Sequence, residues 1–162
     1  MIILDTDILS MFAKIGKIEL LKCLFNEEVA MVPKVRDEIS IPLEYGYAFP
    51  LRVISEIRTV PLSKEALEEY EKLQRNFSLG RGELEAIAYC KTEDCAFATN
   101  DMKAREFAKG EGLFVISLQA ILKALWKKEI KDKEEVKRIL ENIKEADNLS
   151  ISIEVEREIF DE

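Results

Sequence analysis

Four carboxylates from four separate segments of the chain are the residues best suited to chemistry. Each one follows a predicted strand or faces inward from a predicted helix. In a parallel α/β fold such positions meet at one edge of the sheet, where ligands bind. Carboxylates held together repel one another unless a cation lies between them, and their oxygens are ligands that Mg²⁺ and Mn²⁺ prefer. The four residues are Asp5, Glu38, Glu83 and Asp101.

Helical spacing decides which acid of two neighbours faces inward. Glu38 shares a predicted helix face with Val35, whereas Asp37 falls on a less central face. Glu83 lines up with the apolar residues of its helix, and we expect Glu85 to face water. A lone inward glutamate is costly to leave ionised, so inward glutamates favour a shared cation.

Each acid also has a purely structural interpretation. Asp5 and Asp101 are suited to cap the helices that follow them, and the helix dipole favours Glu83 near a helix N-terminus. Glu38 is compatible with a solvated position on a helix. These interpretations stay open for each residue taken alone. Independent caps have no reason to converge in space, so the joint placement of the four acids favours a site.

Composition restricts the chemistry further. The chain has no histidine, which excludes Ser-His-Asp hydrolysis, paired-histidine ribonuclease chemistry and HExxH metalloproteases. Cys23, Cys90 and Cys95 lack the CxxC spacing of a structural zinc site, and we expect them to be small buried apolar residues. An enzyme built from this sequence therefore needs oxygen ligands and a hard metal.

Bulk charge does not decide the partner. The net charge of −8 disfavours binding to a phosphate backbone. The four acids and Asp7 account for five of these negative charges, so the rest of the chain carries only −3 of the −8.

No apolar run approaches the roughly 20 residues of a membrane helix, and the first residues lack the features of a signal peptide. We therefore expect no membrane partner and a cytoplasmic location.

Apolar periodicity predicts strands that alternate with helices. The predicted strands span residues 2–4, 29–32, 57–62, 95–99 and 113–116. The predicted helices span residues 8–15 and 18–25, a segment from Pro33, short pieces within 42–55, and residues 64–76, 83–92, 101–109, 117–126 and 131–146. This alternation predicts an α/β fold with a parallel sheet in a three-layer α/β/α sandwich.

The C-terminal part is expected to pack on the same domain. Residues 131–146 carry apolar side chains on one face, as a surface helix does. The tail from Asn148 is ambiguous between a strand and a helix capped by Ser152, and we favour a short extended piece followed by a helix. The expected organisation is a domain over residues 1–130 with a helical extension over residues 131–162.

The motifs around the acids resemble those of PIN-domain proteins. Residues 2–7 resemble the first strand and acidic turn of that family, and residues 32–39 resemble its second. Residues 82–88, which read GELEAIA, resemble its GE-x-x-AIA helix, and residues 98–101 with Arg105 resemble its final acidic turn. The resemblance is ordered along the chain and spans roughly residues 1–126.

The run over residues 13–21 is further similar to an uncharacterised archaeal and bacterial subgroup related to VapC toxins, which carries a C-terminal extension. Two positions depart from the pattern. Asp7 stands where the family more often has Asn or Ser, and Asn100 stands where this subgroup often has Asp. These departures bear on how many metals bind.

The resemblance implies a ribonuclease that depends on Mg²⁺ or Mn²⁺. Such metals activate a water and stabilise charge during attack on a phosphodiester. The implied catalytic and metal ligands are Asp5, Glu38, Glu83 and Asp101, with Asp7 as a further ligand. The residues implied to orient these ligands or the water are Thr6, Thr99 and Asn100, and those implied to meet substrate phosphates are Arg81, Lys103 and Arg105. Arg105 is equally suited to pair with Asp101 four residues before it.

RNA is thus the expected substrate, a homodimer is expected by resemblance, and an antitoxin protein is a candidate partner. Two alternatives stay open. One is a PIN fold that acts as a binding or assembly module without turnover. The presence of all four acids argues against this alternative. The other is a haloacid-dehalogenase-like phosphatase, whose DxD loop is similar to Asp5-Thr6-Asp7 but which leaves the GE-x-x-AIA-like helix unexplained.

Overall fold

Parallel strands form one sheet with β1 at its centre. A computed structural model describes the whole chain, residues 1–162. The strands are β1 (Ile2–Leu4), β2 (Val29–Met31), β3 (Arg58–Thr59), β4 (Ala96–Ala98) and β5 (Val115–Ile116), in the order β3-β2-β1-β4-β5. Leu4 pairs with Ala98, so β1 and β4 end at the same level. The strand order reverses between these two strands, where α/β sheets bind ligands.

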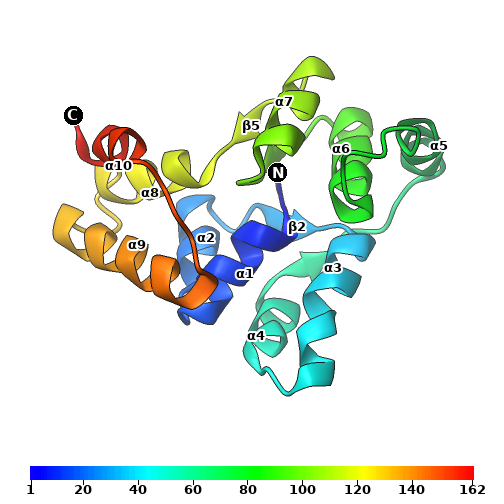
Figure 1. Cartoon of the computed structure of the whole chain (residues 1–162). Helices are drawn as coiled ribbons and strands as arrows, with labels where there is room; N and C mark the ends of the chain where they lie inside the picture. Colours follow the sequence, from blue (N-terminus) through cyan, green and yellow to red (C-terminus); the bar gives the residue numbers. More distant parts are fainter.

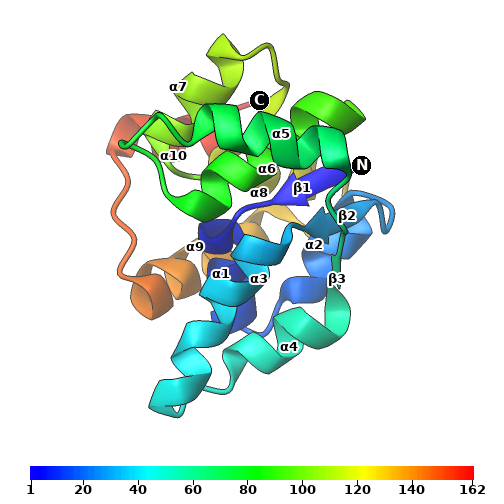
Figure 2. The same cartoon turned by 90° about the vertical axis from the view of Figure 1, so that its right-hand side faces the viewer.

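Helices cover both faces of the sheet. They are α1 (Thr6–Lys14), α2 (Ile18–Leu24), α3 (Pro33–Ser40), the 3₁₀ helix η1 (Ile41–Tyr45), α4 (Phe49–Glu56), α5 (Lys64–Leu73), α6 (Arg81–Glu93), α7 (Met102–Gly110), α8 (Leu118–Lys127), α9 (Lys133–Asp147) and α10 (Ile153–Phe160). Figures 1 and 2 show α5, α6 and α7 on one face and α1 to α4 on the other. The chain is therefore a three-layer α/β/α sandwich, as the sequence predicts.

The C-terminal helices pack beside the layer that contains α1 to α4. Helix α9 contacts α1 and α8, and α10 contacts α8. Val136 and Leu140 of α9 and Ile159 of α10 belong to the same buried apolar cluster as the strands. The tail is extended before α10, and Ser152 caps that helix by accepting a hydrogen bond from Val155 N at 3.2 Å. The predicted extended piece and helix are thus confirmed.

Two sequence expectations differ from the structure. The strand predicted over residues 57–62 is only two residues long, because its neighbour β2 ends at Met31 and the chain turns into α3 at Pro33, so residues after Val60 have no strand with which to pair. Cys90 and Cys95 are buried as expected, but Cys23 is exposed on the outer face of α2. No helix is both long enough and apolar enough to cross a membrane.

Glu85 is buried, so the expectation that it faces water is wrong. Its side chain is only 1% exposed. Its Oε1 accepts a hydrogen bond from Lys34 N at 2.8 Å, and its Oε2 lies 3.3 Å from Lys34 Nζ. The first N–H groups of a helix have no partner within the helix, and a negative charge there is favourable. Glu85 therefore fastens the start of α3 to α6, the two helices that carry Glu38 and Glu83.

Removing this link is expected to destabilise the fold. We expect Glu85→Ala to lower the free energy of unfolding by about 1 to 3 kcal/mol, because Lys34 N loses its acceptor and Lys34 Nζ its partner. Urea denaturation measures the change. Glu93→Ala is a matched control, since Glu93 is exposed on the same helix, and we expect it to change stability by no more than about 0.5 kcal/mol. Equal effects of the two substitutions would contradict the link.

Candidate functional site

The predicted acids lie together around one cavity at the carboxyl ends of β1 and β4. The cavity has a volume of about 380 Å³ and no apolar residue in its lining. The lining residues are Asp5, Thr6, Asp7, Ser10, Lys14, Glu38, Gly80, Glu83, Asp101 and Asp147. We call it the acidic cavity. The turn after β1, helix α3, the start of α6 and the start of α7 each bring one of the four principal acids to it.

Asp5 is the most deeply buried of these acids and is held on both oxygens. It is 3% exposed. Its Oδ1 accepts a hydrogen bond from Thr6 N at 2.8 Å, and its Oδ2 accepts one from Thr99 Oγ1 at 2.6 Å. The Thr99 hydroxyl also accepts a hydrogen bond from Asp101 N at 3.2 Å. Thr99 therefore joins the acidic turn after β1 to the one after β4.

Asp7 joins the same two turns a second time. Its Oδ1 accepts a hydrogen bond from Ile8 N at 2.7 Å, and its Oδ2 accepts one from Asn100 N at 3.0 Å. Asn100 acts here through its backbone, so its contact with the acid does not depend on its side chain. Asp7 is thereby held in place at the edge of the cavity.

Glu38 is the acid of α3 that faces the cavity, while its neighbour Asp37 is exposed and does not line it. Glu38 Oε2 accepts a hydrogen bond from Thr6 Oγ1 at 2.6 Å, and Oε1 accepts one from Gly82 N at 3.1 Å. A Cβ atom at position 82 would lie 2.6 Å from Glu38 Oε1. Glycine at position 82 is therefore needed for Glu38 to approach α6 this closely.

Glu83 has one oxygen without a partner. Its Oε1 accepts a hydrogen bond from Gly80 N at 3.0 Å, which caps the start of α6. Its Oε2 is buried and makes no hydrogen bond. A buried carboxylate oxygen without a donor is costly, because it has lost water and gained nothing in return. This atom is therefore suited to bind a cation.

The structural roles suggested for Asp5, Asp101 and Glu83 at helix starts are correct, and so is the convergence of the four acids; Glu38 is held by Thr6 and Gly82 and is not merely solvated. Asp5 and Asp101 cap α1 and α7, and Asp101 Oδ1 accepts a hydrogen bond from Ala104 N at 2.8 Å. Glu83 bonds the N-terminal backbone of α6 as well. Three helices thus begin at the same end of the sheet, and their capping carboxylates face one cavity.

Burial and mutual repulsion raise the pKa values of Asp5, Asp7 and Glu83. Burial, and next the charge of Asp7, raise the pKa of Asp5 well above its usual range. Burial raises the pKa of Asp7 to about 6, although two backbone N–H groups lower it. Burial also raises the pKa of Glu83, and the charges of Asp101, Asp7 and Glu38 raise it further. Each of these shifts reflects a cavity that disfavours further negative charge and favours a cation.

The donor set suits a hard divalent cation, although the coordination shell is not formed in advance. Carboxylate and hydroxyl oxygens surround the cavity, and such oxygens bind Mg²⁺ and Mn²⁺. As the side chains stand, no group of three or more acids or thiols is arranged to hold a metal ion. Most of the carboxylate oxygens accept hydrogen bonds from the protein, and Glu83 Oε2 is the buried oxygen that has no such bond to give up.

The three basic residues predicted to meet phosphates lie outside the acidic cavity. Arg81 and Lys103 are exposed and Arg105 is half-buried, and none of them lines the cavity or forms an ion pair. The suggested pair between Arg105 and Asp101 is absent. Only the helical hydrogen bond from Arg105 N to Asp101 O joins them, at 3.0 Å.

Four lining residues, Ser10, Lys14, Gly80 and Asp147, are absent from the predicted site. Ser10 lies three residues after Asp7, and Lys14 lies four residues after Ser10. These spacings place all three on one face of α1, so the helical period predicts that Ser10 and Lys14 lie beside Asp7. Asp147 ends α9, and its Oδ1 lies 2.6 Å from Lys14 Nζ. No local pattern connects Asp147 to residues so far away in the chain. Lys14 is the single basic residue in the lining of the cavity.

The raised pKa of Asp7 predicts how stability depends on pH. Asp7 titrates at about 6 in the fold against an ordinary value of 3.8, so the folded state binds its proton more tightly. The stabilising contribution is complete below the lower value and is lost as pH rises through the higher one. We therefore expect the stability of Asp7→Asn, relative to wild type, to rise by on the order of 2 kcal/mol between about pH 4 and pH 7.

Urea denaturation in a chelating buffer measures this difference across the pH range. Asp37→Asn serves as the control and is expected to show no such trend, because Asp37 is exposed beside Glu38. A difference between Asp7→Asn and wild type that stays constant with pH would contradict the assigned environment of Asp7.

Comparison with known proteins agrees with the fold. A family model described as a PIN domain matches residues 1–162. No curated protein matches the chain. PIN domains are in general nucleases that use divalent metals, so the match leaves no support for the phosphatase alternative. Because the matched region extends over the whole chain, the chain belongs to the PIN-domain family.

Proposed function

We propose that the acidic cavity is the active site of a metal-dependent ribonuclease. The observation that carries the proposal is the convergence of acids from four segments on one cavity without apolar lining, together with the buried, unpartnered Glu83 Oε2. The metal ligands we propose are Asp5, Glu38, Glu83 and Asp101, with Asp7 beside them. Mg²⁺ or Mn²⁺ is the proposed cofactor because all of the available ligands are oxygens.

The chain's own residues position the reaction. A bound divalent cation would supply an activated water and would offset charge on the phosphodiester. Thr99 holds the carboxylate of Asp5, Thr6 holds that of Glu38, and the backbone of Asn100 holds that of Asp7. These hydrogen bonds hold the carboxylates at the cavity, as residues behind metal ligands commonly do. No histidine base is then required.

Substrate phosphates need positive charge near an acidic site. Lys14 lines the cavity itself and is the nearest candidate to contact the phosphate beside the reacting bond. Arg81, Lys103 and Arg105 lie on α6 and α7 without ion pairs, and we propose that they contact phosphates further along the strand. RNA is the proposed substrate.

A catalytically silent PIN fold is the second candidate. The observation that favours it is that no three acids are arranged to hold an ion as they stand. The two candidates differ in turnover, and metal binding alone does not separate them. Cleavage by the wild-type chain, lost on substitution of the acids, decides between them.

Substitution of single acids tests the proposed active site. We expect wild type to bind Mn²⁺ and to cleave RNA, and we expect Asp5→Asn and Glu83→Gln to weaken Mn²⁺ binding by about 10-fold to 100-fold and to abolish cleavage. Calorimetric titration with Mn²⁺ and cleavage of an end-labelled RNA provide the two measurements.

Asp37→Asn is the matched control, because it changes an acid of the same helix as Glu38 that does not line the cavity. We expect it to leave binding and cleavage unchanged. Binding of Mn²⁺ without cleavage by the wild type would favour the silent fold. Absence of Mn²⁺ binding would refute the proposed metal site.

The close approach of Glu38 to α6 gives a further test. We expect Gly82→Ala to push the Glu38 carboxylate away, because the new Cβ would lie 2.6 Å from its Oε1, and to weaken Mn²⁺ affinity by roughly 10-fold. Gly110→Ala is the control, since a Cβ there meets no atom within 4 Å. Equal Mn²⁺ affinities in the two variants would show that the position of Glu38 does not matter for the metal.

A further inference from the structure

A second cavity lies beside the acidic cavity and differs from it in character. Its volume is about 550 Å³, within the range of ligand sites. The lining residues are Lys14, Pro42, Tyr47, Ala48, Phe49 and Ala146. We call it the aromatic pocket. Lys14 lines both cavities, so a ligand that spans them would pass its ammonium group.

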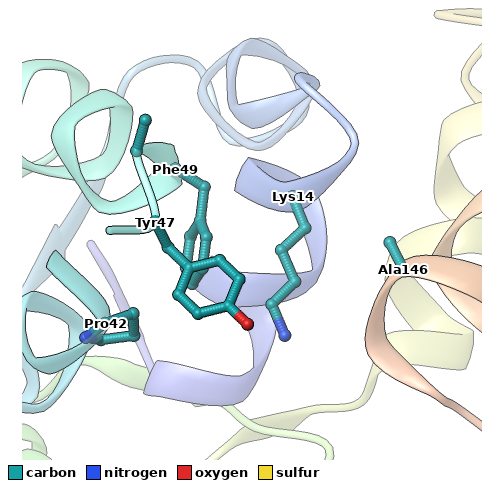
Figure 3. A pocket seen from close by; sticks show the side chains of 6 residues that line it. Lys14, Pro42, Tyr47, Phe49 and Ala146 are labelled. Carbon is teal, nitrogen blue, oxygen red and sulfur yellow. The ribbon is translucent and has the colours of Figure 1, made fainter. Parts of the chain in front are cut away.

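Two aromatic rings form one side of the aromatic pocket. Phe49 is half-buried at the start of α4, and Tyr47 precedes it with 61% of its surface exposed. The ring centroids lie 6.4 Å apart with an interplanar angle of 59°. Figure 3 shows the Phe49 ring behind that of Tyr47, the Lys14 side chain beside them, and Ala146 of α9 across the pocket. No part of the chain covers the exposed Tyr47 ring.

Lys14 brings positive charge to this aromatic wall. Its Nζ lies 5.4 Å from the centroid of the Phe49 ring and 2.6 Å from Asp147 Oδ1. A ligand that suits the pocket is therefore flat and apolar on its faces and has an anionic group next to it. An unpaired nucleobase with its phosphate has this chemistry, because every base offers a face for stacking and each is joined to a phosphate.

We propose that the aromatic pocket binds an unpaired RNA base next to the phosphodiester that lies in the acidic cavity. This inference rests on the proposed ribonuclease function and names the residues that would receive a base of its substrate. Tyr47 and Phe49 supply stacking surface, and Lys14 contacts the phosphate between the base and the reacting bond. A base inside a duplex cannot enter, because both of its faces are already stacked.

The pocket is expected to accept different bases. Its lining offers aromatic and aliphatic surface, the Lys14 ammonium group and the Tyr47 hydroxyl, and no side-chain amide or carboxylate that would distinguish base edges. Stacking without such hydrogen bonds tolerates any sequence. The selectivity that follows is for unpaired over paired RNA and not for one nucleotide over another.

Binding of a short single-stranded RNA that carries one fluorescent 2-aminopurine tests the proposal. The full-length chain is titrated into this RNA with a chelator present, so that the strand stays intact, and anisotropy and base fluorescence are recorded. We expect wild type to quench the base. We expect Tyr47→Ala and Phe49→Ala to weaken binding by roughly 5-fold to 100-fold and to abolish the quenching.

Two further variants separate stacking from a general effect. Tyr47→Phe keeps the ring and is expected to bind as wild type does. Tyr45→Ala removes a more exposed ring, 75% accessible, that does not line the pocket, and is expected to leave binding unchanged. A duplex of the same sequence is expected to bind wild type and Tyr47→Ala equally. Because Tyr47 is exposed, its loss is not expected to disturb folding, which circular dichroism checks.

The outcomes distinguish this inference from the function on which it rests. If wild type cleaves RNA with Mn²⁺ but Tyr47→Ala and Phe49→Ala bind the single strand as tightly as wild type, the ribonuclease stands and the aromatic pocket is not a base site. Equal weakening for single strand and duplex also overturns the base site. If wild type neither binds nor cleaves RNA, both proposals fail.

Discussion

The crowding of carboxylates where the strand order reverses is the constraint on which the rest of the site depends. Four acids and Asp7 are drawn to one edge of a parallel sheet, and burial with mutual repulsion raises the pKa values of Asp5, Asp7 and Glu83. Such an arrangement persists only if donors are supplied at each oxygen or a cation is bound. The fold supplies donors for most of these oxygens from helix N-termini and threonine hydroxyls.

The same carboxylates thus serve local structure and chemistry. Asp5 and Asp101 begin helices, and Glu83 bonds the backbone just before α6, so the turn that places each acid is stabilised by that acid. Convergence follows because, in a parallel sheet, the helices after β1 and β4 start at the same edge. Glu85 lies outside the acidic cavity and stabilises it by holding the start of α3 against α6. Helix capping and site formation are two consequences of one topology.

Much of the fold and of the acidic cavity can be predicted from patterns within single segments of the sequence. The remainder depends on contacts between segments that are distant in the chain. The alternation of strands and helices and the inward direction of Glu38 follow from periodicity within single segments. Glu85 was misassigned because its partner, Lys34, lies on another helix, and burial of an acid is visible only together with that partner. Asp147 was missed for the same reason, whereas Lys14 was within reach through its spacing from Asp7 on α1. Strand β3 is short because its neighbour β2 ends at Met31, where the chain turns into α3.

Anomalous diffraction from crystals soaked in Mn²⁺ tests the proposed site most directly. The proposed metal-dependent ribonuclease site predicts a Mn²⁺ peak in the acidic cavity within about 2 Å of Glu83 Oε2 and of an oxygen of Asp5 or Asp101. A peak confined to other parts of the surface, or an acidic cavity that stays empty at millimolar Mn²⁺, would contradict it.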